Sequence, residues 1–428
     1  MDWLDALRGI AALVVVFEHS SYSYLAELRR ELVPEFNTGR YGVLVFFLVS
    51  GYIIPASLER RGDVRAFWIG RVFRIYPLWA VVVAAALAAD LAGLAQARGQ
   101  GGAAGFVAHL TLLQELLGTP SLLIVLWTLS YEMAFYLVVV ALFAVRQHRR
   151  SGAVAVTFAC LAAVSAAVGL ALPVSALSGA VGTVPLIALA SVALVVAIGC
   201  GCAGSPVPRV FGGVLGGVLA LVLVASNGTV PVWEGLVVLA VMFLGTAVHR
   251  AENGQSTWRY AACTAVVVVA CAVGSAYWHG DGAHSTRRGW ILAFLLAVLT
   301  FGIGLAARRL RTPRWLVGLG TISYSVYLLH PVLLAVSDGT IGRGHPHGPL
   351  LVPAFYAVLL PLCVLTHRWV EAPARGWGRE LVRRGGATGS GPARAAPAAA
   401  PVARPRCERA PVAELDGAEP QRGHGETR

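Results

Sequence analysis

The chain has 428 residues, of which 57% are hydrophobic and only 13% charged, and its mean hydropathy is +0.69. A soluble protein of this length needs far more charge to cover its surface, so the composition excludes a soluble globular fold. The formal net charge is +12 without a single Lys, but the Arg residues lie between apolar blocks, which disfavours a nucleic-acid-binding surface.

Apolar segments of about 20 residues match the ~30 Å hydrocarbon core of a bilayer. The chain contains up to twelve of them, so we predict an all-α fold, a polytopic transmembrane helical bundle of about 10–12 spans. The predicted spans are 4–24, 41–58, 72–94, 122–145, 153–172, 179–200, 210–226, 232–248, 260–278, 290–307, 315–336 and 349–367. The Gly-rich block 179–226 has a second interpretation, because Gly-rich segments also form re-entrant loops.

The distribution of Arg predicts the orientation in the membrane. With a cytoplasmic N-terminus, the cytoplasmic loops hold fifteen Arg and the external loops seven. This asymmetry favours a multi-pass protein of the plasma membrane with both termini cytoplasmic. We assign residues 1–375 to one transmembrane domain. Residues 376–428 are rich in Ala, Pro, Gly and Arg without an apolar period, which predicts a disordered cytoplasmic tail.

Ionisable residues inside membrane spans are costly and therefore indicate function. Arg8 and His19 lie eleven residues apart in the first span, on nearly the same helical face and ~16 Å apart along the axis. We expect both to face one cavity, with Arg8 holding an anionic group and His19 moving a proton. The alternative is that Arg8 marks topology and His19 is a structural interior histidine. Glu18 points about 100° away from His19 around the helix, so it need not be its partner.

A second cluster follows the second span. Arg71 and Arg74 are three residues apart and share a helical face at the membrane surface. Two guanidinium groups there suit the phosphates of a nucleotide-like ligand. Orientation in the membrane or binding of anionic lipid explains the same residues.

Two further spans carry polar groups. Glu132 lies in an otherwise apolar segment, where a carboxylate must be protonated or paired, so we expect it to face a polar cavity. Ser50 and Gly51 lie within the second span, where Gly permits close helix packing. Ser50 has no adjacent base that would make it a nucleophile.

The last predicted spans contain the segment GTISYSVYLLHP. Its Tyr324, Tyr327 and His330 either line a pocket for a hydroxylated acceptor or anchor the helix at the interface. Glu371 and Pro373, in RWVEAP, are expected to end the last helix. The chain has no P-loop, because it has no Lys, and no HExxH or Ser-His-Asp motif.

Six segments, taken in order over residues 1–373, resemble the membrane-bound acyltransferase-3 family of polytopic O-acyltransferases. They are LDALRGIAALVVVFEH, FFLVSGYII, RVFRIYP, WTLSYEMAFYLV, ISYSVYLLHP and RWVEAP. The resemblance implies an acyl-CoA donor, usually acetyl-CoA, bound from the cytoplasm, and an acceptor hydroxyl on a carbohydrate. No metal is implied.

By carry-over from the resemblance, His19 is the catalytic histidine and Glu132 supports the site. The donor's phosphates would contact Arg71 and Arg74. Arg8, which we expect to hold an anionic group, is the third candidate donor-binding residue. Ser50, Tyr324, Tyr327 and His330 are the candidate substrate-pocket residues. The family core usually has about ten helices, fewer than the twelve counted here.

Two mechanisms and two function classes remain open. His19 either deprotonates the acceptor hydroxyl for direct attack on the thioester, which we favour because it needs one positioned base, or is acylated first. The acceptor is a surface glycan or a glycosylated natural product such as a macrolide. The alternative class is a transporter or flippase of glycan or lipid-linked substrates, which would show inverted repeats that this chain lacks.

Overall fold

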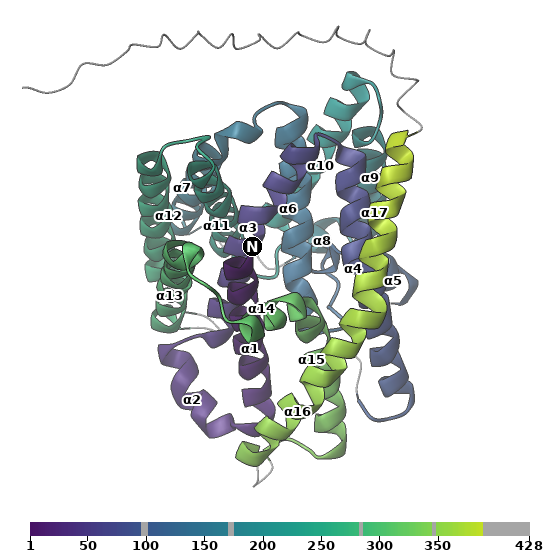
Figure 1. Cartoon of the computed structure of the whole chain (residues 1–428), viewed down its shortest axis with the longest axis vertical. Helices are drawn as coiled ribbons and strands as arrows, with labels where there is room; N and C mark the ends of the chain where they lie inside the picture. The colour runs from purple at the N-terminus through teal and green to yellow at the C-terminus, as the bar shows by residue number, and fades with distance from the viewer. Residues whose placement is uncertain (96–101, 170–174, 282–285, 345–347, 388–428) are drawn as a thin grey trace, which may run out of the picture. The chain divides into compact units, whose positions relative to one another are not determined.

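The structure is a computed structural model that describes residues 1–95, 102–169, 175–281, 286–344 and 348–387. Within these ranges all regular structure is helical and no strand is present (Figure 1). The predicted all-α fold is confirmed.

The first half of the chain contains both long and short helices. The long ones are α1 (Asp2–Tyr24), α3 (Thr38–Arg61), α4 (Val64–Leu91), α6 (Trp127–Ala144) and α7 (Ser151–Ala167). The short ones are α2 (Ala26–Glu35), α5 (Gly102–Leu110), η1 (Gln114–Leu117), η2 (Ile124–Leu126) and η3 (His148–Arg150).

The second half of the chain is built mainly of long helices. Its long helices are α9 (Thr183–Gly201), α10 (Pro206–Ser226), α11 (Val232–Glu252), α12 (Trp258–His279), α13 (Arg287–Ala306), α15 (Ser323–Thr340) and α16 (Gly348–Thr366). The others are α8 (Ala176–Val181), η4 (Ala307–Arg309), α14 (Arg314–Thr321), the π-helical η5 (His367–Glu371) and α17 (Ala372–Ala387).

Each of the twelve predicted spans contains a helix. In the described part of the chain, ten helices are long and apolar enough to cross a membrane, and the bent pair α14–α15 makes an eleventh. Helix α1, which carries Arg8, Glu18 and His19, is not among them. The Gly-rich block forms two packed helices, α9 and α10, rather than a re-entrant loop. The end of the predicted span 153–172 lies outside the described residues.

Helix α11 lies at the centre of the bundle. In its most apolar stretch 83% of the residues are buried, against 33% in α9 and α12. It packs against α3, where Gly51 lets the two backbones touch: a Cβ at this position would lie 1.8 Å from the carbonyl oxygen of Met242. This contact confirms the close helix packing that the sequence predicts around Gly51.

A tight turn joins α3 to α4. Gly62 ends α3 with a φ of 65°, and the Asp63 side chain accepts a hydrogen bond from the Arg65 N–H at 2.8 Å to begin α4. The turn brings Ser57, near the end of α3, beside Arg71 in α4.

The chain breaks between α14 and α15, which meet at a bend of 63°. Helix α14 packs against α1, and a Cβ on Gly320 would lie 1.9 Å from the carbonyl oxygen of Asp5. Helix α15 continues between α1 and α4. The break thus brings the start of α15 beside the charged face of α1.

One expectation for the end of the domain is wrong. Glu371 does not end the last helix: it is buried in the π-helical turn, and the helix continues as α17. The described helix extends to Ala387. The division into a transmembrane domain of residues 1–375 and a tail remains a prediction, because residues 388–428 lie outside the described ranges.

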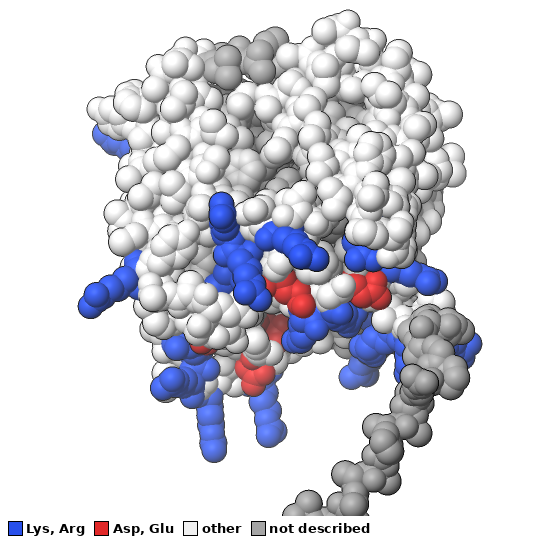
Figure 2. Space-filling view, turned by 90° about the horizontal axis from the view of Figure 1, so that it is seen from above, with Lys and Arg blue, Asp and Glu red and all other residues white. Residues whose placement is uncertain are grey.

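Many of the Arg residues that we assigned to cytoplasmic loops lie at helix ends. Arg60 and Arg61 end α3, and Arg250 lies in the last turn of α11. The face seen from above in Figure 2 shows Arg side chains gathered around a few carboxylates. We call the end of the bundle formed by the end of α3 and the start of α4 the Arg-rich end.

Candidate functional site

Two adjacent cavities lie among α1, α3, α4, α6 and α15. The larger, with a volume of about 610 Å³, is lined by His19 and is called the His19 cavity. The smaller, of about 60 Å³, is lined by Arg8 and is called the Arg8 cavity. Val43 and Tyr327 line both, so these two side chains form the wall between them.

We expected His19 and Arg8 to face one cavity, and this expectation is wrong. They share a face of α1, but the wall formed by Val43 and Tyr327 divides the space in front of it. The wall residues come from α3 and α15, which are remote from α1 in sequence. The helical period of α1 alone carries no information about them.

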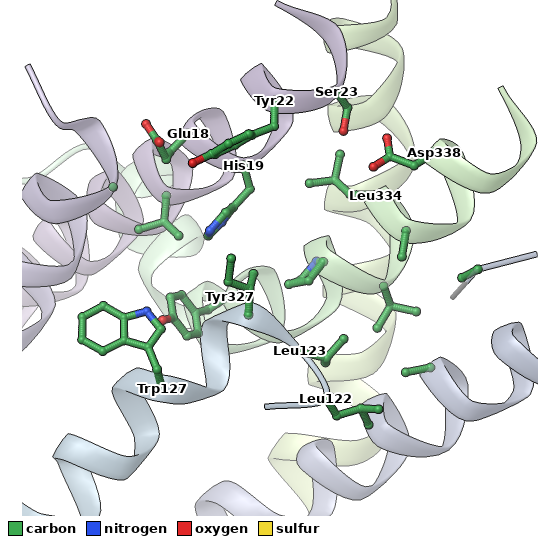
Figure 3. Close-up of a pocket in the computed structure, with 18 of the residues that line it drawn as sticks. Glu18, His19, Tyr22, Ser23, Leu122, Leu123, Trp127, Tyr327, Leu334 and Asp338 are labelled. Atoms are coloured by element: carbon green, nitrogen blue, oxygen red, sulfur yellow. The ribbon is translucent and has the colours of Figure 1, made fainter. Parts of the chain in front are cut away.

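The His19 ring points from α1 toward Tyr327 and Trp127 (Figure 3). Its Nδ1 lies 2.9 Å from Nε2 of His330, and the two rings stack with centroids 5.1 Å apart. His330 is fully buried, and its Nδ1 lies 2.8 Å from the carbonyl oxygen of Val326. His330 thus lies behind His19 and lines neither cavity.

Charged side chains in the His19 cavity are paired. The Glu18 carboxylate accepts a hydrogen bond from the Thr38 hydroxyl and lies 3.4 Å from Arg29. Arg40 lies 2.9 Å from Glu234 and stacks over the ring of Trp127 at 4.9 Å. Pairing offsets the cost of holding these charges away from water.

The opposite part of the His19 cavity is apolar. It is lined by Ala86, Ala89, Leu122, Leu123, Val332 and Leu334. Figure 3 shows Leu122 and Leu123 across from Glu18 and His19, whereas Leu334 lies beside the polar Ser23 and Asp338. The cavity therefore combines hydrogen-bonding groups with an aliphatic surface.

The Arg8 cavity brings together residues that the sequence singled out separately. Arg8 and Arg74 line it with Glu132, which accepts a hydrogen bond from the Tyr136 hydroxyl at 2.5 Å. Ser50 and Tyr324, two of the predicted pocket residues, also line it, and the Tyr324 hydroxyl donates a hydrogen bond to the carbonyl oxygen of Ile75 at 2.9 Å. Two cations and one carboxylate in so small a space leave a net positive site.

Arg71 lies apart from this lining. It is buried, donates to the Ser57 hydroxyl at 2.9 Å, and lies over the rings of Phe67 and Tyr136 at 5.0 and 5.1 Å. One of its terminal nitrogens, Nη1, is buried without a partner among the described residues. Tyr136 thus contacts both Arg71 and the Glu132 carboxylate.

Tyr327 has a defined orientation in the wall. Its hydroxyl lies 2.7 Å from the Thr128 hydroxyl and donates to the carbonyl oxygen of Val125 at 3.0 Å. These bonds fix its ring at the start of α6. The wall between the cavities is therefore held from both α15 and α6.

The sequence reasoning missed a buried carboxylate near the Arg8 cavity. Glu371 accepts hydrogen bonds from the Ser325 hydroxyl and from Arg375, the latter at 2.8 Å. In the sequence, a carboxylate in the motif RWVEAP resembles a helix end. Its buried hydrogen bond with Ser325 is visible only in the structure and shows that Glu371 joins α15 to the last helices. The described residues contain no group of three or more metal-ligating side chains that would hold a metal ion.

Comparison with known proteins places the chain among acyltransferases. The profile of the acyltransferase-3 family, described as an acyltransferase domain, matches residues 1–368. The chain is 34% identical over 143 residues to the acyltransferase MdmB of Streptomyces mycarofaciens, covering 31% of this chain and 37% of the relative. No solved structure matches.

Two other relatives align over similar lengths. The putative peptidoglycan O-acetyltransferase YrhL of Bacillus subtilis is 29% identical over 174 residues, which cover 35% of this chain and 26% of the relative. Nodulation protein 10 of Rhizobium leguminosarum is 28% identical over 177 residues, 37% of this chain and 48% of the relative. The chain thus spans less than half the length of each of these relatives.

Proposed function

We propose a function from one premise: the chain belongs to the acyltransferase-3 family. It transfers an acyl group, in the simplest case acetyl, from acyl-CoA to a hydroxyl of a carbohydrate or a glycosylated natural product. The printed names of two relatives, an acyltransferase and a putative peptidoglycan O-acetyltransferase, support this reaction class.

One observation carries the proposal: a histidine cavity and a cationic cavity meet at a single wall. His19 lines the first, Arg8 and Arg74 line the second, and Val43 and Tyr327 belong to both. A two-substrate transfer needs two adjoining cavities, and the thioester has to reach past the side chains of this wall, because the reacting atoms must approach within about 3–3.5 Å.

The donor enters from the Arg-rich end, which we place in the cytoplasm. The Arg8 cavity, about 60 Å³, is too small for a whole CoA molecule and suits only its narrow thioester arm. The phosphates then remain near the surface, where Arg74 attracts them. Arg71 acts on the same site through Tyr136, which it shares with Glu132.

The acceptor occupies the His19 cavity. Its volume of about 610 Å³ lies within the usual range for small-molecule sites, roughly 300–1,000 Å³. The polar side suits hydroxyl groups, and Trp127 offers an aromatic face for a sugar ring. The aliphatic side suits the apolar body of a glycosylated natural product or a lipid-linked glycan.

In the reaction, His19 removes the proton of the acceptor hydroxyl, and the oxygen attacks the thioester carbonyl carbon. The C–S bond then breaks, and the CoA thiolate takes the proton back from His19. Because the cavities are adjacent, both substrates are bound together, which supports direct transfer over an acyl-histidine intermediate.

The test uses purified protein in sealed vesicles with radiolabelled acetyl-CoA, which does not cross the membrane. Glycans and glycosylated macrolides are offered as acceptors. We expect His19→Ala to lower the transfer rate by about 10²–10⁴-fold. His279→Ala is the matched control, because His279 lies at the exposed end of α12, where it bonds the backbone carbonyl of Ala166.

Label transfer must also depend on which end of the protein faces the donor. We expect activity only when the Arg-rich end is on the acetyl-CoA side, as established by a cleavable tag at the N-terminus. Full activity of His19→Ala would remove His19 from the mechanism, and transfer with either orientation would contradict the assigned donor side.

A further inference from the structure

We propose that His330 is a positioning residue that fixes the tautomer of His19 and so leaves Nε2 of His19 as the basic nitrogen. This inference rests on the proposed role of His19. It is drawn from a chain of two hydrogen bonds that links the carbonyl of Val326, the ring of His330 and the ring of His19.

The hydrogen bond to Val326 shows that Nδ1 of His330 carries a proton. The carbonyl oxygen of Val326, one turn earlier in α15, lies 2.8 Å from Nδ1 of His330. A carbonyl only accepts hydrogen bonds, so Nδ1 of His330 must carry a proton. This bond forms within α15, so it does not depend on substrate.

Burial determines whether the other ring nitrogen of His330, Nε2, carries a proton. The side chain is fully buried, in contact with Tyr327 and His19. A charged imidazolium there would incur a large desolvation cost, and no carboxylate among the described residues pairs with it, so the ring is neutral. With its one proton on Nδ1, Nε2 of His330 is a hydrogen-bond acceptor.

The second bond passes this constraint to His19. Nδ1 of His19 lies 2.9 Å from Nε2 of His330, and an acceptor there requires a donor. His19 therefore carries its proton on Nδ1, and its Nε2 holds the free lone pair. Since His19 lines the cavity while His330 does not, the free lone pair belongs to the ring that meets the acceptor.

The arrangement also serves the second half of the reaction. When Nε2 of His19 takes the acceptor's proton, the ring becomes an imidazolium whose Nδ1–H still bonds His330. A hydrogen bond from a charged donor is stronger than a neutral one, so His330 stabilises the charged form as it appears. The bond to His330 also opposes a flip of the His19 ring, because a flip would put a carbon in place of Nδ1.

The experiment compares three substitutions of His330 in the full-length protein in vesicles, with acetyl-CoA and whichever of the offered glycans or glycosylated macrolides the wild type acylates. In His330→Gln the amide oxygen can reach the former position of Nε2 and accept from His19. His330→Asn is too short to do so, and His330→Leu has no acceptor. His279→Gln is the control.

We expect kcat to fall about 10–100-fold in His330→Leu and His330→Asn, with KM for acetyl-CoA unchanged, as for other groups that orient a functional histidine. His330→Gln should recover most of this loss. A purely structural role would lower the amount of folded protein in all three variants without this split between kcat and KM. Unchanged kcat in His330→Leu, or no recovery in His330→Gln, would overturn the proposal.

A second readout does not depend on the transfer reaction. Diethyl pyrocarbonate modifies unprotonated imidazole nitrogens, and mass spectrometry of peptides measures its rate at His19. We expect this rate to fall severalfold in His330→Leu and to recover in His330→Gln. If wild type transfers no acyl group but the His19 rates follow this order, the proposed function fails and the tautomer assignment stands. Equal rates at His19 in all variants would contradict the assignment.

Discussion

Two sets of helices in this protein are both apolar enough to span a membrane, but they differ in how much of their surface is covered by other helices. The central helices are α3, α6 and α11, in which 67%, 78% and 83% of the residues of the most apolar stretch are buried. The peripheral helices are α9, α12 and α13, with 33%, 33% and 28%. The difference shows that hydropathy indicates only that a helix can span the membrane. How deeply the helix is buried determines whether its polar and small residues contact other helices.

Glycine illustrates this difference. Gly51 in α3 and Gly245 in α11 lie where a Cβ would meet backbone atoms at 1.8 and 2.3 Å. Gly199, Gly274 and Gly302, in the three peripheral helices, have open space around the same position. The first pair sets the distance between two helices, and the others are consistent with surfaces that face lipid.

The largest expected effect tests that contrast directly. Gly51→Ala should lower the free energy of unfolding by about 3 kcal/mol or more, because the new methyl group forces two backbones apart. Gly274→Ala should leave it unchanged or raise it by up to ~1 kcal/mol, from helix propensity. Thermal unfolding of the protein in detergent measures both, and equal shifts would remove the distinction between the two sets.

The next effect concerns charge. Arg74→Gln should raise KM for acetyl-CoA about tenfold, which is ~1.4 kcal/mol, because it removes a cation from the Arg8 cavity. Arg259→Gln, at the exposed start of α12, should change KM by less than twofold. Initial rates over a series of acetyl-CoA concentrations give both KM values. Equal changes in the two variants would show that the net charge of the protein, rather than a specific binding site, attracts acetyl-CoA.

The smallest expected effect concerns hydroxyl groups. Tyr327→Phe removes the bonds to Thr128 and Val125 and should cost ~1 kcal/mol of stability. Tyr277→Phe, on the exposed surface of α12, should change stability by less than about 0.5 kcal/mol. Denaturation midpoints of the two variants measure this difference in stability. If Tyr327→Phe leaves stability unchanged, packing alone holds the wall.

Much of the fold could be predicted because a bilayer demands long apolar helices, and these are visible as runs in the sequence. The bend between α14 and α15 could not, since the apolar run continues through it. It coincides with the close contact between Gly320 and Asp5, and that contact forms only once α14 packs on α1.

The candidate site divides in the same way. The period of α1 places Arg8 and His19 on one face, which the structure agrees with. The wall between them comes from Val43 and Tyr327, and the bond from His19 to His330 joins residues 311 positions apart. Neither leaves a local signal, because both arise from the packing of α3 and α15 around α1.

The thin wall between the two cavities has a consequence for the design of inhibitors. A bisubstrate compound, with a pantetheine-like arm in one cavity and a polyol in the other, would gain affinity from linkage, since its second half binds at a high effective concentration. Its linker must pass the ring of Tyr327, whose hydroxyl is fixed by two hydrogen bonds. Short, flat linkers are therefore the ones to synthesise, and their fit against this tyrosine would be the source of selectivity.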